Sequence, residues 1–235
     1  MTGKETSEKT KNMITEVQKA IGDAVLKEAG FLRKGNTYNR KTEDGLTQVV
    51  DFRRYKKYQG EPTMLIVDLA IRVPEATRRN LDSSESGASF YKSHDCSEAL
   101  RVVSETKELF GHDLMFCIDI GDASDQLYWF PHDKRYQKEK TAEEVIAEIT
   151  SAFNNGAMKF FDDMKSREKV LENHHKYSKV MLHSGLWKLE SSFIYGALGQ
   201  MDKAKVTFNE YRKKAGKGHK GHNELLDGYV KECGF

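Results

Sequence analysis

The sequence predicts an α+β fold: a mainly antiparallel sheet of four to five strands, covered by helices on one face and followed by a helical C-terminal part. Three observations predict this class. Residues 14–25 carry apolar side chains at three- and four-residue steps, which indicates an amphipathic helix. Alternating apolar runs separated by turns follow as far as residue 73 and indicate strands. From Thr141 onward the spacing becomes helical again.

The first helix is predicted from one apolar stripe and one stop signal. Its stripe consists of Ile14, Val17, Ile21 and Val25, with Met13 and Ala24 beside it. The polar and charged residues that lie off the stripe are Glu16, Gln18, Lys19, Asp23 and Lys27. Gly30 is predicted to end the helix, because glycine readily adopts the left-handed conformation found after helix C-termini.

The strands are predicted from period-two alternation between turn residues. Gly35 and Asn36 interrupt the first run, so a short or bulged strand is expected around 37–40. Glu43-Asp44-Gly45 predicts a hairpin turn. The third strand is the clearest, because its apolar residues alternate as far as Pro74, which cannot donate to a strand ladder. The predicted core strands are 49–52, 65–73, 114–120 and a short aromatic strand at 127–130.

The C-terminal third is predicted to be helical. Thr141 and Glu144 have the spacing of a capping box, in which each side chain accepts a hydrogen bond from the other residue's amide. Asn154-Asn155-Gly156 predicts the end of this helix, and a second helix follows. The change in pattern suggests an α+β domain at 1–175 and a helical hairpin tail at 176–235, which can pack as part of one domain.

Composition limits the classes of function. A net charge of +2 over 235 residues does not by itself indicate a polyanionic partner. No apolar run approaches the roughly 20 residues that a membrane span needs. Three cysteines at unrelated spacings do not form a disulfide framework, so we expect a cytoplasmic protein without membrane association.

Several packing motifs resemble a family of bacterial proteins known as domain of unknown function DUF 4304. The resemblance covers roughly residues 14–165 and begins at Leu26-Lys-Glu-Ala-Gly-Phe-Leu-Arg-Lys-Gly35, followed by Tyr38. The family has no established activity to carry over, but some related domains look like immunity proteins, which implies a binding function. The other matching motifs are Val50-Asp-Phe52, Val67-Asp-Leu69, Asp119-Ile-Gly121, Leu127-Tyr-Trp129 and the helix start at Thr141.

The tail has a resemblance of its own. The run from Ser192 to Ala204, followed by Phe208 and Tyr211, resembles a single tetratricopeptide-type helical hairpin. Such repeats stack in arrays of about three or more, so one copy also fits an ordinary helical hairpin docked on the first domain.

Three aspartates in the middle of strands form one candidate site. If the faces of their strands coincide, Asp51, Asp68 and Asp119 lie near Arg53 and Arg72. Such a polar pocket could hold a cation or supply a general base. The alternative interpretation is a set of cross-strand ion pairs on a wet sheet face.

A basic and aromatic stretch at 33–58 forms the second candidate site. Its cations could contact phosphates while its tyrosines stack on bases, or they could bind an acidic protein. The alternative is a solvated strand edge, where lysines also prevent aggregation. The partner-binding candidates are Arg53, Arg54, Tyr55, Tyr58 and Trp129.

We therefore weigh three hypotheses about function. The leading one is a non-catalytic protein-binding module, immunity-like in character, with a protein partner of unknown identity. The alternatives are a nucleic-acid-binding protein that uses 33–58 and an enzyme that uses the aspartate pocket. The sequence lacks the spaced motifs of hydrolases, zinc proteases and dinucleotide-binding proteins, so we expect no catalytic residues, metal or cofactor.

Overall fold

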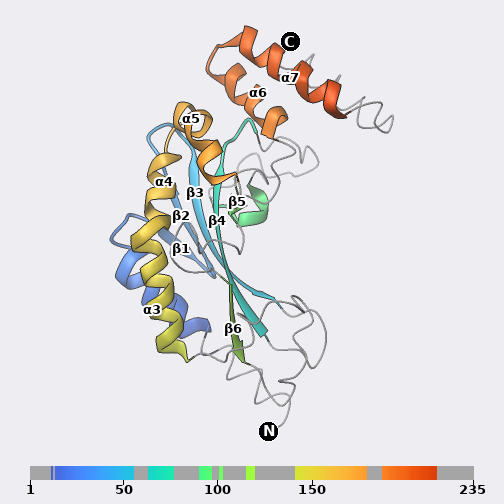
Figure 1. Cartoon of the computed structure of the whole chain (residues 1–235). Coiled ribbons are helices and arrows are strands. Elements are labelled where there is room, and N and C mark those ends of the chain that lie inside the picture. Colours follow the sequence, from blue (N-terminus) through green and yellow to red (C-terminus); the bar gives the residue numbers. More distant parts are fainter. Residues whose placement is uncertain are drawn as a thin grey trace.

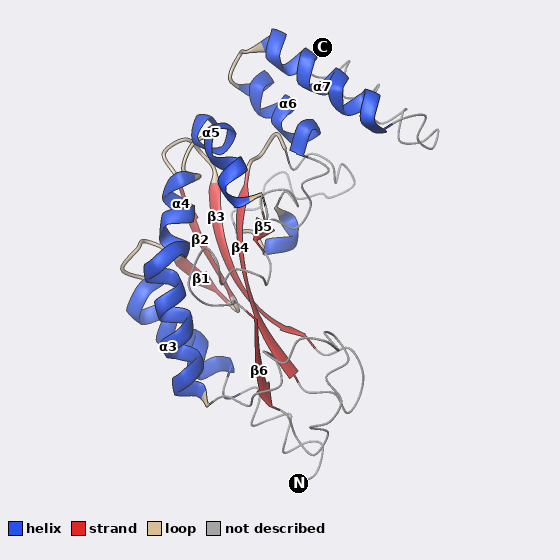
Figure 2. Ribbon diagram, in the orientation of Figure 1, coloured by secondary structure: helices blue, strands red, loops and turns tan. Residues whose placement is uncertain are grey.

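The computed structural model of the chain confirms the α+β class (Figure 1). A twisted antiparallel sheet is covered on one face by helices, and a helical hairpin follows at the C-terminal end (Figure 2). The structure describes residues 12, 14–55, 63–76, 90–96, 101–102, 115–119, 141–178 and 187–215.

Within the described residues the sheet has six strands, in the order β1-β2-β3-β4-β5 with β6 also pairing with β4. All the pairings are antiparallel. The long central pair runs in register from Thr47 opposite Arg72 to Tyr55 opposite Met64. The bounds are β1 (Leu32–Lys34), β2 (Thr37–Lys41), β3 (Thr47–Tyr55), β4 (Thr63–Arg72), β5 (Arg101–Val102) and β6 (Met115–Asp119).

The six described strands are one more than the upper end of the expected range, and two of them, β1 and β5, are only three and two residues long. Gly35 and Asn36 do not merely interrupt a strand; they form the two-residue turn between β1 and β2. Gly35 has a φ of 62°, the left-handed conformation that such a turn requires. The predicted aromatic strand at 127–130 lies outside the described residues.

Helices cover the inner face of the sheet. Residues 14–21 are α-helical and continue into the wider π-helical turn η1 (Gly22–Leu26). Along the C-terminal part lie α3 (Ala142–Ala152), η6 (Phe153–Ala157), α4 (Met158–Asp163), α5 (Arg167–Tyr177), α6 (Trp187–Ala197) and α7 (Met201–Ala215), while the short 3-10 helix η2 (Ser93–Asp95) lies earlier in the chain.

The helix that begins with Thr141 does not end at Asn154-Asn155-Gly156, so that prediction was wrong. The capping box forms as expected, but the chain passes through η6 directly into α4. Met158 N donates to Phe153 O, five residues back, instead of four. Because η6 buries Gly156 and Ala157, the apolar face remains on the sheet across this turn.

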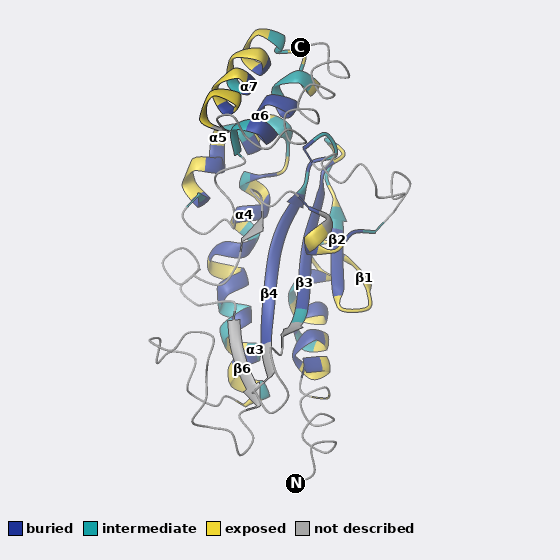
Figure 3. Cartoon of the chain, turned by 90° about the vertical axis from the view of Figure 1, so that its right-hand side faces the viewer, coloured by how far each residue is buried: buried dark blue, intermediate teal, exposed yellow. Residues whose placement is uncertain are grey.

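The core fills the space between the inner face of the sheet and these helices. Alternate residues of β4 from Leu65 to Ile71 are completely buried in it, as the apolar alternation predicts. Figure 3 shows β3 and β4 as the most deeply buried part of the sheet. Aromatic rings from the helices complete the core, with Phe160 contacting Phe161 at 5.4 Å and Tyr177 at 5.1 Å between ring centroids.

Tyr38 of β2 links the first helix to the sheet through a hydrogen bond and a ring contact. Its hydroxyl donates to Gln18 O at 3.0 Å, and its ring packs edge-on against Phe52. The ring lies so close to Gly22 that a Cβ there would overlap the Tyr38 hydroxyl and lie 2.8 Å from Cζ. Glycine at position 22 is therefore required by this close approach.

A relay of polar side chains links the ends of two helices through the inner face of the sheet. Arg40 Nη1 donates to Ala29 O at 2.8 Å, at the end of the first helix. Arg40 Nε donates to Gln48 Oε1 at 2.7 Å, and Gln48 Nε2 donates to Phe161 O at 2.6 Å in α4. Burial lowers the pKa of Arg40, although the charge of Asp162 acts in the opposite direction.

The hairpin of α6 and α7 packs against α5. The His174 ring stacks on Trp187 with centroids 3.6 Å apart and planes 2° from parallel. Ile194 of α6 belongs to the same core cluster as the sheet. The expected domain boundary after residue 175 falls within the last turn of α5.

Candidate functional site

The predicted carboxylate pair lies on the outer face of the sheet, opposite the helical layer. Asp51 of β3 and Asp68 of β4 are cross-strand partners, and the two residues are 4% and 0% exposed respectively. In β4 the apolar alternation places Asp68 on the face away from the core, as the sequence predicts.

Both oxygens of Asp51 accept hydrogen bonds from neighbouring groups. Thr37 Oγ1 donates to Oδ1 at 2.9 Å from β2. Oδ2 lies 3.0 Å from both the amide nitrogen and the Oγ of Ser93. The carboxylate thus joins a neighbouring strand to the start of η2.

Asp68 is bound by an arginine and by the same serine. Arg53 Nε and Nη2 donate to its two oxygens at 2.5 and 3.0 Å. Ser93 Oγ lies 2.8 Å from Asp68 Oδ2, between the two carboxylates. Burial lowers the pKa of Arg53, but the hydrogen bonds and charge of Asp68, with the charge of Asp51, outweigh this and raise it above its ordinary value.

These bonds hold segment 90–96 against the outer face. Beside the aspartates, Asn39 pairs with the backbone of Tyr91: its Nδ2 donates to Tyr91 O at 2.8 Å, and its Oδ1 accepts from Tyr91 N at 2.6 Å. Arg72 lies 3.9 Å above the Tyr91 ring. Val49, Ala70, Tyr91 and Cys96 form a small apolar cluster under the segment.

The arrangement anchors a segment by buried hydrogen bonds and leaves the two carboxylates covered. All four oxygens of Asp51 and Asp68 accept bonds from within the chain. A general base must come within hydrogen-bonding distance of a substrate proton. In this conformation the two carboxylates are covered and already bonded, so a substrate proton could not reach them.

The structure does not gather the whole predicted pocket. Asp119 lies in register with Thr63 of β4. Thr63 is five residues from Asp68, so the backbone of Thr63 and the backbone of Asp68 are roughly 17 Å apart. Arg72 stacks on Tyr91 four residues beyond Asp68 in the other direction. Asp51, Asp68 and Arg53 therefore come together, while Asp119 and Arg72 occupy other positions on the strands.

Most of the partner-binding candidates lie where side chains are not described. Arg54 and Tyr55 are the last residues of β3, in register with Leu65 and Met64. Tyr58 and Trp129 lie outside the described residues. These four stay predictions, and the fifth candidate, Arg53, pairs with Asp68.

The basic stretch at 33–58 is divided between the two faces of the sheet. Two of its four aromatic residues, Tyr38 and Phe52, are buried in the core and cannot stack on a base. Arg40 is held by the inner-face relay. The exposed remainder on the outer face includes Lys34 and Lys41.

One exposed surface on the β1–β2 hairpin combines an apolar residue with cations. Leu32 is 74% exposed, and Lys34 Nζ lies 6.0 Å from the centroid of the Phe90 ring. Leu32 is in register with Asn39, and the Asn39 side chain donates a hydrogen bond to the Tyr91 carbonyl. The β1–β2 hairpin therefore adjoins segment 90–96. We name this the hairpin surface, formed by Leu32, Lys34, Lys41, Phe90 and Lys92.

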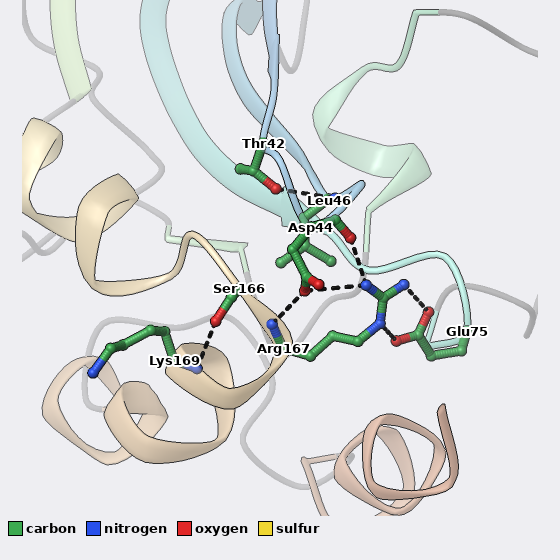
Figure 4. Close-up of polar contacts among 7 residues, drawn as sticks. All are labelled: Thr42, Asp44, Leu46, Glu75, Ser166, Arg167 and Lys169. Carbon is green, nitrogen blue, oxygen red and sulfur yellow. Dashed lines mark hydrogen bonds and ion pairs between the residues drawn. The ribbon is translucent and has the colours of Figure 1, made fainter. Parts of the chain in front are cut away.

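A second polar cluster, which no pattern in the sequence indicated, joins the turn between β2 and β3 to α5 (Figure 4). The Arg167 guanidinium donates to both oxygens of Glu75 at 2.5 and 3.0 Å. It also donates to Asp44 O at 2.6 Å, while the Arg167 amide donates to Asp44 Oδ2 at 2.8 Å. The pKa of Arg167 is raised above its ordinary value, and the largest cause is its hydrogen bonding to Glu75. Burial alone would lower this pKa.

Comparisons with known proteins assign no relative: no family model, curated protein or solved structure matches the chain. Within the described residues, no group of three or more histidine, cysteine, aspartate or glutamate side chains could hold a metal ion. None of the helices in that part of the chain is long and apolar enough to span a membrane.

Proposed function

We propose that the protein is a non-catalytic module that binds an acidic segment of a partner protein through the hairpin surface. The observation that carries this proposal is the exposure of Leu32 beside Lys34 on β1, a strand whose three residues are all exposed. Protein interfaces commonly use such an apolar anchor with a polar rim around it.

The charges on this surface favour an acidic partner. Lys34, Lys41 and Lys92 are exposed around the hairpin, whereas Asp51 and Asp68 are buried beneath segment 90–96. Complementary charge accelerates association and excludes partners of the same sign. An immunity-like protein, which sequesters one target, would use a surface of this kind.

The aspartate pair supports the non-catalytic part of the proposal. A catalytic carboxylate must reach the reacting atoms. Here Asp51 and Asp68 accept bonds from Thr37, Ser93 and Arg53, and this network fixes segment 90–96, whose Phe90 contributes to the hairpin surface.

A capture experiment with matched variants tests the proposal. The full chain, Leu32→Ser with Lys34→Glu, and Val206→Ser would each be immobilised and exposed to nuclease-treated lysate of the native host. Val206 is the appropriate control because it is also an exposed apolar residue, on α7. We expect a protein that the wild type and Val206→Ser retain and the double variant loses.

The captured protein would then be purified and titrated against each variant. An affinity at least about tenfold lower for the hairpin variant, equivalent to about 1.4 kcal/mol, is expected. Equal affinities for all three chains would refute the hairpin surface. Alanine variants of Tyr55, Tyr58 and Trp129, measured in the same titration, test whether the predicted aromatic residues extend it.

A further inference from the structure

Helix α7 presents a basic surface on the side away from α6. Its buried residues Ala204, Phe208 and Tyr211 form one stripe. The helix contains five basic residues against two acidic ones, Asp202 and Glu210. Glu210 forms an ion pair with Lys188 of α6, so its charge is already compensated within the hairpin.

The cations of α7 lie along two flanks of the exposed side. At 3.6 residues per turn, Lys205 and Arg212 are two turns apart on one flank. Lys203 and Lys214 are three turns apart on the opposite flank. All four residues are exposed. Lys203 also donates to Gln200 Oε1, and its Nζ lies 5.7 Å from the centroid of the Tyr195 ring, so this flank borders α6.

A narrow ridge of other side chains runs between these flanks. Val206 is 60% exposed, and helical spacing places Asn209 and Lys213 on the same outward side. Asn and Lys are side chains that pair with adenine and guanine edges, and an aliphatic group can contact the thymine methyl. The acidic Asp202 lies at the start of this ridge, in the first turn.

We propose that α7 binds duplex DNA by lying in the major groove, with its ridge toward the base edges and its two cationic flanks toward the two phosphate strands. A major groove about 12 Å wide admits one α-helix and has a row of phosphates on each side. The proposal is independent of the hairpin surface, which lies on a different part of the molecule.

The placement of cations on both flanks of α7 favours the major groove of DNA over the flat surface of an acidic protein. A flat partner would contact one stripe of the helix, whereas cations on both flanks match phosphates on both sides. The sequence after α7 adds two further cations, Lys217 and Lys220, before the next acidic residue, Glu224. The proposed site itself comprises the residues of α7.

Fluorescence anisotropy with the full chain and a mixed-sequence DNA duplex tests the proposal. Four flank cations predict that log K falls with log salt concentration with a slope of about −3 to −4 between roughly 50 and 200 mM salt. Lys205→Glu with Lys214→Glu removes one cation from each flank and should weaken binding at least tenfold at about 50 mM salt. Lys205→Arg with Lys214→Arg should retain it.

The control variant is Lys19→Glu with Lys27→Glu, which makes the same charge change on the exposed side of the first helix. It should bind the duplex like the wild type, and thermal melts would confirm that each variant is folded. Absence of duplex binding at low salt, or equal losses for both pairs, would overturn the proposal. Equal affinity for polyglutamate would overturn it as well and would indicate an acidic protein instead.

Discussion

Asp51 and Asp68 face each other across the central strand pair, and Ser93 Oγ lies within 3.0 Å of both carboxylates. A hydroxyl has a single proton, so it can donate fully to one carboxylate at a time. The remaining donors are therefore essential to the pair: Thr37 and the Ser93 amide for Asp51, and Arg53 for Asp68.

The first prediction concerns this shared hydroxyl. Ser93→Ala should lower the free energy of unfolding by about 1–3 kcal/mol, because it removes a buried donor from carboxylates that cannot reach water. Urea denaturation measures the change. Ser178→Ala removes an exposed hydroxyl that donates to His175 O and should change stability by less than about 0.5 kcal/mol. Similar values for the two variants would contradict the anchoring role.

The second prediction concerns the close approach of Gly22 and Tyr38. Gly22→Ala should destabilise the protein by about 1–3 kcal/mol, because its Cβ overlaps the Tyr38 ring and hydroxyl. Tyr38→Phe removes the hydroxyl and its bond to Gln18 O. The double variant should therefore be less destabilised than the sum of the single variants, and a double-mutant cycle measures this coupling. Simple additivity would show that the two residues do not clash.

The third prediction concerns pH. Burial raises the pKa of Asp163, but hydrogen bonds from Lys159 and Tyr177, with lysine charges, outweigh it and hold the pKa below its ordinary value. A depressed carboxyl pKa contributes stability above the unfolded value of about 3.9 that is lost as pH falls through the folded pKa. Asp163→Asn should thus reduce the loss of stability below about pH 5, as urea midpoints measured across this range would show.

The partner of Asp163 titrates at the other end of the pH scale. Burial and then the hydrogen bond to Asp163 raise the pKa of the Tyr177 hydroxyl. Its contribution is complete below the unfolded pKa of about 10 and is lost as pH rises through the folded pKa. Tyr177→Phe should abolish this alkaline loss. An identical alkaline profile for the wild type and Tyr177→Phe would contradict the assignment.

The fourth prediction concerns Arg167, which joins the hairpin turn at Asp44 to Glu75. Arg167→Lys keeps the charge but removes the two-pronged bond to Glu75, so unfolding should become easier by about 1–3 kcal/mol. Lys169, two residues from Arg167, forms an exposed ion pair with Glu172. Lys169→Met removes this pair and should leave the urea midpoint unchanged. Equal midpoints for wild type and Arg167→Lys would show that this contact does not contribute to stability.

Local patterns predicted the features of this chain that depend on near neighbours. The alternation of β4 predicted its buried face and placed Asp68 on the other face, and the capping box at Thr141 forms as expected. These features follow from side-chain periodicity and from bonds between residues three positions apart.

Contacts between distant parts of the sequence could not be predicted in this way. Asn39 and Tyr91 are 52 residues apart, and Asp44 and Arg167 are 123 apart. Segment 90–96 carries no regular apolar period, so its role in covering the aspartates had no signal in the sequence. In the basic stretch, grouping by composition combined Tyr38 with exposed lysines, although Tyr38 belongs to the buried face.

At Asn154-Asn155-Gly156 a local pattern gave a wrong prediction. Local propensity predicts a helix end there, because glycine and asparagine favour left-handed and turn conformations. The helix continues because η6 buries Phe153, Gly156 and Ala157 in the core. Tertiary burial thus overrides the local preference of this segment.

The relay from Ala29 through Arg40 and Gln48 to Phe161 makes opening of the sheet and fraying of the helices a single event. Sliding β2 past β3 by one residue would part Arg40 from Gln48, which are register partners, and so release both helix carbonyls together. Amide hydrogens in the last turns of these two helices should therefore exchange at a common rate with those of the β2–β3 ladder, as one cooperative unit.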